Sequence, residues 1–181
     1  MILACFGNSI TEGYMVPRDK SWPAILEQIS EIKTLNFGIS GDTTFDALGR
    51  LETVLNAQHD AVFVELGIND FFMGIPMEST KKNLGRICQT FLDRQKEVFL
   101  AGFSFKGQGS KNWEVMYREL SADFAINLYP NIFKGISGNS RFFLPDGLHP
   151  NSEGYNIIAQ NIADFLQENL PHSLVAAHHI I

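Results

Sequence analysis

The chain alternates short, continuous apolar runs with longer segments whose apolar residues recur at helical spacing. Continuous apolar runs predict strands buried on both faces, as in parallel sheets, whereas i, i+3, i+4 spacing predicts helices with one apolar face. Expected strands lie at 2–6, 34–37, 60–66, 98–101 and, more weakly, 125–128. Apolar residues at helical spacing include Trp22, Ile25, Leu26 and Ile29; Leu48, Leu51 and Leu55; Leu84, Ile87, Cys88, Phe91 and Leu92; Trp113, Met116, Tyr117, Leu120 and Phe124; and Tyr155, Ile158, Ala159, Ile162 and Phe165. Five strands alternating with helices predict an α/β fold, a three-layer α/β/α sandwich around a five-stranded parallel sheet.

The size and composition fit one compact domain over residues 1–181, because no repeat, linker or low-complexity segment divides the chain. Hydrophobic residues make up 45% and charged residues 19% of the sequence, which is typical of a globular domain. The net charge of −6 and the lack of Lys/Arg clusters argue against nucleic acid as a partner. No apolar stretch approaches the length of about 20 residues that spans a bilayer, so no integral membrane segment is predicted.

Several further expectations concern cofactors and location. Cys5 and Cys88 have neither metal-ligand nor redox-motif spacing and are predicted to be buried thiols. His178 and His179 lie in an apolar tail, Leu174 to Ile181, without a partner at ligand spacing, so metal binding there is not expected. The sequence has no phosphate-cradling Gly-rich loop of either common type, and no cofactor is predicted. A cytoplasmic location is predicted, or a periplasmic or secreted one if a signal peptide has been removed. The oligomeric state and the role of the tail stay open.

Small polar clusters follow the first three predicted strands, at residues 7–11, 38–43 and 67–70. Parallel sheets bind their ligands at the carboxyl ends of the strands, so these clusters are expected to share one rim. Ser9 lies directly after the first strand, where the backbone N–H groups of a helical turn favour a developing negative charge. Such a serine is either a nucleophile or an ordinary helix cap.

A second candidate group is Asp146-Gly147-Leu148-His149-Pro150, a glycine- and proline-rich loop near the C-terminus. In a tight turn the carboxylate of Asp146 can fold back onto the ring of His149, fix its tautomer and stabilise the imidazolium that forms when it takes a serine proton. The alternative is an Asx-type turn with an exposed histidine.

Gly41 and Asn69 are candidates for the stabilisation of an oxyanion. Acyl transfer develops negative charge on a carbonyl oxygen, and donors aimed at that oxygen in advance lower the barrier. Gly41 can bring its backbone N–H close to a ligand because it has no side chain, and Asn69 offers a neutral amide. The alternatives are a left-handed turn glycine and an asparagine that stabilises a turn.

Taken together, four blocks resemble the SGNH (GDSL) hydrolase family. They are Gly-Asn-Ser-Ile-Thr at 7–11, Asn-Phe-Gly-Ile-Ser-Gly-Asp-Thr at 36–43, Gly-Ile-Asn-Asp at 67–70 and Asp-Gly-Leu-His-Pro at 146–150. The resemblance implies a flavodoxin-like fold and a metal-independent serine esterase. It implies Ser9 as nucleophile, His149 as base, Asp146 as its orienting acid, and an oxyanion hole formed by Ser9, Gly41 and Asn69. Asn8 stands where the family usually has aspartate; asparagine is expected to keep the local shape and lose only the charge.

Further segments resemble the small thioesterase, arylesterase and lysophospholipase branch of that family, which implies a small-molecule ester or thioester substrate. They are Gly13-Tyr14, Ser21-Trp22-Pro23, Glu65-Leu66-Gly67, Gly74-Ile75-Pro76 and residues 132–138. Phe71, Phe72 and Met73 follow Asn69 directly and either wall an acyl pocket or pack inward beneath their loop. A carbohydrate O-deacetylase and a catalytically inactive binding domain of the same fold are the alternatives; the presence of every residue that the reaction needs argues against the second.

Overall fold

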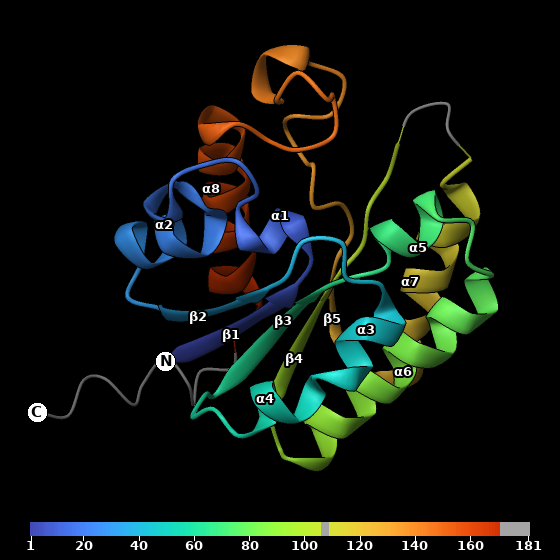
Figure 1. Cartoon of the computed structure of the whole chain (residues 1–181). Helices are drawn as coiled ribbons and strands as arrows, with labels where there is room; N and C mark the ends of the chain where they lie inside the picture. The colour runs from blue at the N-terminus through green and yellow to red at the C-terminus, as the bar shows by residue number, and fades with distance from the viewer. Residues whose placement is uncertain (106–108, 171–181) are drawn as a thin grey trace, which may run out of the picture.

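The computed structural model, which describes residues 1–105 and 109–170, is a single parallel sheet between two layers of helices (Figure 1). The strands are β1 (Ile2–Gly7), β2 (Lys33–Gly38), β3 (Ala61–Glu65), β4 (Glu97–Ala101) and β5 (Asn127–Tyr129). They are arranged in the order β2-β1-β3-β4-β5, and each neighbouring pair is parallel. The central strands β1 and β3 carry almost only buried residues, as the continuous apolar runs predicted.

The helices cover both faces of this sheet (Figure 1). The helices α2 (Trp22–Ile29) and α8 (Ser152–Asn169) pack against each other on one face. On the other face lie α3 (Thr44–Gly49), α4 (Leu51–Leu55), α6 (Met77–Asp93) and α7 (Lys111–Phe124). Two short helices, α1 (Ser9–Glu12) and α5 (Ile68–Phe72), start within three residues of the ends of β1 and β3, and two 3-10 turns cover Arg18–Lys20 and Ser140–Phe142. The predicted three-layer α/β/α fold is confirmed.

Some details differ from the sequence-based expectations. The segment expected as one helix around Leu48 to Leu55 is divided at Arg50, which ends α3 and starts α4. The last strand begins two residues later than expected, because α7 continues to Phe124 and Ala125 ends it in a left-handed conformation. Ile29 keeps the helical spacing of α2 but is 46% exposed. The apolar tail, Leu174 to Ile181, lies outside the described residues.

The strand register brings the polar clusters to one rim. Gly7, the last residue of β1, pairs with Gly38 at the end of β2 and with Glu65 at the end of β3. The segments that follow these three strands therefore leave the sheet at the same level. This arrangement brings the segments that carry Ser9, Gly41 and Asn69 to the same edge of the sheet although they are far apart in sequence.

Candidate active site

Ser9 is held at the first turn of a short helix by the residues around it. Asn8 is fully buried and caps α1, because its Oδ1 accepts a hydrogen bond of 2.9 Å from the N–H of Ile10. The helix is only four residues long and ends at Gly13, whose left-handed backbone lets its N–H and that of Tyr14 donate to the carbonyl of Ser9. Both ends of this turn are thus fixed, and Ser9 itself is 7% exposed.

The loop between residues 143 and 150 brings Asp146 and His149 to Ser9. Phe143 and Pro150 form an isolated bridge that closes the loop, and Gly147 has a φ of 70°, which favours glycine. His149 Nδ1 lies 2.8 Å from Asp146 Oδ2, and His149 Nε2 lies 2.9 Å from Ser9 Oγ. Because a carboxylate only accepts hydrogen bonds, Nδ1 carries the ring proton and Nε2 accepts from the serine hydroxyl.

Asp146 is also fixed by the backbone of its own loop. Its Oδ1 accepts hydrogen bonds from the N–H groups of Leu148 at 2.9 Å and His149 at 3.0 Å. Partial burial raises the pKa of Asp146, but these two bonds and the contact with the His149 ring outweigh that effect and hold the pKa below its usual value. Asp146 is therefore an anion at neutral pH. The alternative was an Asx-type turn with an exposed histidine; the loop has the hydrogen bonds of such a turn, but the His149 side chain is only 17% exposed and contacts Asp146.

Three hydrogen-bond donors are candidates for binding an oxyanion: the backbone N–H groups of Ser9 and Gly41 and the side-chain amide of Asn69. Within residues 1–105 and 109–170, the backbone N–H groups of Ser9 and Gly41 donate no hydrogen bond. Asn69 donates one amide proton to the carbonyl of Asp42 at 2.8 Å, which fixes its side chain. Gly41 has a φ of 87°, a backbone conformation that favours glycine, and a Cβ there would point into open space. Unpaired donors held on a rim can bind a developing oxyanion.

Two residues near Ser9, Tyr14 and Tyr155, were not predicted from the sequence to belong to the site. The ring of Tyr14 lies against the ring of His149, with 4.5 Å between centroids and a tilt of 43°. The buried hydroxyl of Tyr155 lies 3.4 Å from the carbonyl of Ser9. Neither contact leaves a local signal in the sequence, since Tyr14 and His149 are brought together only by the fold.

Glu65 is a further residue that the sequence pattern did not identify as part of the site. Its carboxylate accepts hydrogen bonds from Asn8 Nδ2 at 3.0 Å and from Thr11 Oγ1 at 2.9 Å. Burial raises the pKa of Glu65 to about 7, against the lowering effect of these two donors. Glu65 thus holds α1 in place through its hydrogen bonds with Asn8 and Thr11. Asn8 suits this position because its amide donates to a carboxylate. An aspartate there could share a hydrogen bond with Glu65 only when one of the two acids carries a proton. A carboxylate at the end of an otherwise apolar strand was the available signal.

A cavity of about 330 Å³ lies beside the His149 loop, with Gly147 among its lining residues. Its apolar wall consists of Phe105, Phe133 and Phe143, and its polar lining residues are Ser104, Ser137, Asn139 and Ser140. Among the described residues, the lining does not include Phe71, Phe72 or Met73.

The three apolar residues after Asn69 have different environments. Phe71 packs inward, 5.5 Å from the ring of Phe103 and 5.6 Å from that of Trp113. Phe72 and Met73 are 48% and 67% exposed, and the ring of Phe72 lies 5.5 Å from that of Phe105, a wall of the cavity. Both rings thus contact Phe105, with 6.0 Å between centroids for Phe71 and 5.5 Å for Phe72, although neither residue lines the cavity itself.

Residues 1–105 and 109–170 contain neither a cluster of metal-ligating side chains nor a membrane-spanning helix. No group of three or more His, Cys, Asp or Glu side chains in this part of the chain is arranged to hold a metal ion. No helix within it combines the length and apolar character needed to cross a membrane. Cys5 and Cys88 are both buried free thiols.

A serine hydroxyl, an imidazole and a carboxylate in a hydrogen-bonded chain, on an α/β scaffold, define the class of serine hydrolases. The sequence profile of the GDSL-like lipase/acylhydrolase family matches residues 5–157. The chain belongs to this family and is an ester-hydrolysing serine hydrolase, which confirms the resemblance seen in the four sequence blocks.

Individual relatives cover nearly the whole chain. An arylesterase of Vibrio mimicus is 31% identical over 93% of this chain and 89% of its own length. Thioesterase 1/protease 1/lysophospholipase L1 of Escherichia coli (strain K12) is 30% identical over 94% of this chain and 85% of its own length. Among solved structures, the psychrotrophic esterase EstA from Pseudoalteromonas sp. has a TM-score of 0.85 at 24% identity, covering 92% of this chain and 97% of that one, and shares the fold.

Proposed function

We propose that the chain hydrolyses esters or thioesters of small apolar acyl groups through an acyl-enzyme at Ser9. The carrying observation is the chain of hydrogen bonds from Asp146 through His149 to Ser9, whose own backbone N–H has no acceptor among the described residues. The names of the relatives, an arylesterase and a thioesterase/lysophospholipase, support the same substrate class.

In the first half of the reaction, Ser9 Oγ bonds to the carbonyl carbon of the substrate while its proton passes to His149 Nε2. The carbonyl oxygen becomes an oxyanion that the N–H groups of Ser9 and Gly41 and the Asn69 amide bind. When the intermediate collapses, the bond from carbon to the leaving oxygen or sulfur breaks, and His149 gives its proton to that atom. Water then repeats the sequence on the acyl-enzyme and releases the acid.

The role of Asp146 is to hold His149 in the required tautomer. Its lowered pKa keeps the carboxylate charged, so it favours the imidazolium that forms when His149 takes the proton of Ser9. The ring proton stays on Nδ1, and no proton passes to Asp146. His149 Nε2 therefore remains the single atom that exchanges protons with the substrate.

The cavity beside Gly147 is the proposed acyl site. Its volume of about 330 Å³ lies at the low end of the range, about 300–1,000 Å³, that binds small molecules, which favours short chains. Its three phenylalanine rings favour an apolar group. Its serines and Asn139 are the observation that would favour acetylated sugars, so the deacetylase is the second candidate.

Two measurements test the proposal. A fluorophosphonate should label the wild-type chain at Ser9, and Ser9→Ala should abolish both labelling and turnover. If the wild type is neither labelled nor active, the alternative of a catalytically inactive binding domain would be supported. A panel of p-nitrophenyl esters from acetyl to dodecanoyl, each compared with its thioester, then reports the acyl preference. A strict preference for acetylated sugars would support the deacetylase instead.

A filling variant tests the cavity itself. Ser137 is exposed and lines the cavity, so Ser137→Trp should lower turnover of long-chain esters more than turnover of acetate esters. Ser79→Trp, on the surface of α6 and outside this cavity, is the matched control and should leave the acyl preference unchanged. An unchanged chain-length profile in Ser137→Trp would exclude this cavity as the acyl site.

A further inference from the structure

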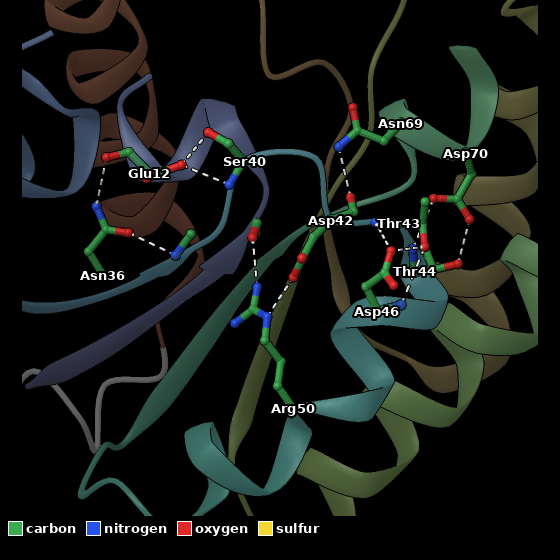
Figure 2. Close-up of polar contacts among 12 residues, drawn as sticks. Glu12, Asn36, Ser40, Asp42, Thr43, Thr44, Asp46, Arg50, Asn69 and Asp70 are labelled. Carbon is green, nitrogen blue, oxygen red and sulfur yellow. Dashed lines mark hydrogen bonds and ion pairs between the residues drawn. The ribbon is translucent and has the colours of Figure 1, made fainter. Parts of the chain in front are cut away.

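The segment between β2 and α3 carries Gly41 and is anchored on both sides of it (Figure 2). Before Gly41, Ser40 donates its N–H and its hydroxyl to the carboxylate of Glu12, at the end of the helix that carries Ser9. After Gly41, Thr44 donates its N–H to Asp70 at 2.9 Å. Gly41 lies between these anchors, and its own N–H has no acceptor within the described ranges, 1–105 and 109–170.

Asp42, the residue after Gly41, forms an ion pair that is largely shielded from solvent. Its Oδ2 accepts a hydrogen bond of 2.5 Å from Nε of Arg50, and the side chains of Asp42 and Arg50 are 11% and 18% exposed. Arg50 occupies the junction between α3 and α4, where the helix expected as one piece is divided. The junction thus directs a guanidinium toward the rim of the sheet (Figure 2).

The same guanidinium reaches the strand that leads to Ser9. Nη2 of Arg50 donates to the carbonyl of Gly7 at 3.0 Å, and its Cζ lies 4.7 Å from the ring centre of Phe6. Gly7 is the last residue of β1, two residues before Ser9. Arg50 therefore links the residue after Gly41 to the strand end before Ser9 through two hydrogen bonds from one planar group.

The third donor depends on the same residue. The backbone carbonyl of Asp42 accepts the amide proton of Asn69 at 2.8 Å (Figure 2). A displacement of Asp42 would therefore move the Gly41 N–H and the Asn69 amide together, relative to Ser9. Asp42 thus contacts the Asn69 side chain directly, and it is linked through Arg50 to Gly7 at the end of β1.

We propose that Arg50 is a positioning residue that sets the geometry of the oxyanion hole by holding Asp42 against the end of β1. This inference rests on the proposed roles of Ser9, Gly41 and Asn69. Arginine suits the task because its rigid fork binds two acceptors at once, whereas lysine offers a point charge on a flexible stem. Arg50 does not touch the substrate; it acts through Asp42 and Gly7.

The test compares Arg50→Met, Arg50→Lys and Asp42→Asn with the wild type on a p-nitrophenyl ester. Loss of one oxyanion donor lowers kcat by about 100-fold to 1,000-fold. Because Arg50→Met displaces donors without removing them, kcat should fall by about 10-fold to 100-fold, with KM within about threefold. Arg50→Lys should recover part of this loss. Asp42→Asn should cause a smaller loss than Arg50→Met, because an asparagine oxygen still accepts from the guanidinium.

Inhibition by an aryl boronic acid gives the readout that a purely structural role would not move. The boronate forms a tetrahedral adduct at Ser9 with an oxygen in the position of the oxyanion, so its affinity should weaken in the same proportion as kcat/KM. A thermal melt gives the folded fraction of each variant, and the rates are expressed per folded chain. Arg94→Met is the matched control, since Arg94 is exposed at the turn before β4, and it should keep both kcat and boronate affinity.

The outcomes separate this inference from the proposed function. If the wild type neither labels nor turns over esters, the proposed function fails first. If the wild type is active but Arg50→Met and Asp42→Asn keep kcat and boronate affinity within twofold per folded chain, the positioning role is wrong. If Arg50→Met does not fold, Asp42→Asn and Arg50→Lys still decide, because unchanged boronate affinity in both would overturn the inference.

Discussion

Replacing Glu65 by glutamine should change how the stability of the protein depends on pH. Burial raises the pKa of Glu65 from 4.5 to about 7, so the folded chain holds this proton more tightly than the unfolded chain does. The Glu65 carboxyl therefore lowers the free energy of unfolding once the pH is high enough for the group to ionise in the unfolded chain. The penalty is absent below pH 4.5, grows as the pH rises and is complete above pH 7.

The magnitude follows from the two pKa values. A difference of about 2.5, at about 1.4 kcal/mol per pKa unit, corresponds to about 3 kcal/mol in the free energy of unfolding. Glutamine has nearly the same shape, and its carbonyl oxygen can still accept the hydrogen bond from Asn8. Its amide cannot ionise, so Glu65→Gln should lack this pH-dependent loss.

Urea unfolding, followed by tryptophan fluorescence between pH 4.5 and 8, measures the effect. The stability of Glu65→Gln relative to the wild type should rise by about 3 kcal/mol across this range. Glu52→Gln is the control, because Glu52 is exposed on α4, and its profile should run parallel to that of the wild type. Parallel profiles for Glu65→Gln and the wild type would refute the assignment of a buried, titrating carboxyl to this position.

Three further changes test the surroundings of Ser9. Asn8→Asp places a second acid against the buried Glu65, so its free energy of unfolding should fall by about 2–4 kcal/mol at pH 8 and by less at pH 5; equal losses at both pH values would contradict this. Tyr14→Ala removes the ring that lies on His149 and should lower kcat/KM about fivefold, as expected for an aromatic contact of about 1 kcal/mol. Tyr14→Phe should keep the wild-type value, and equal losses in both variants would point to the hydroxyl instead. His149→Ala should lower kcat by about 10,000-fold or more while circular dichroism stays unchanged, and a milder loss would exclude His149 as the base.

The fold was accessible from the sequence because its determinants are local and repetitive. Apolar runs that alternate with helical periods specify a parallel sheet covered on both faces, and residues 2–6 or 60–66 show this without any knowledge of their partners. Element ends were less predictable. Arg50 divides the helix around Leu48 to Leu55, and its side chain forms long-range contacts with Asp42 and the carbonyl of Gly7 that no local pattern reveals.

The sequence by itself determined the inventory of the site. Ser9, Gly41, Asn69, Asp146 and His149 stand out because each follows a predicted strand or lies in a rigid loop, and together they match one family pattern. Such residues are recognisable since reaction chemistry restricts the side chains that can serve it.

Only the tertiary structure decided how those residues are held. The strand register places Gly7, Gly38 and Glu65 side by side, and the closure of the 143–150 loop brings His149 to Ser9 across 140 residues of sequence. Glu65 beneath Asn8 and Arg50 beside Asp42 became visible in the same way. Their roles come from burial and through-space hydrogen bonds, which depend on distances that a linear sequence does not contain.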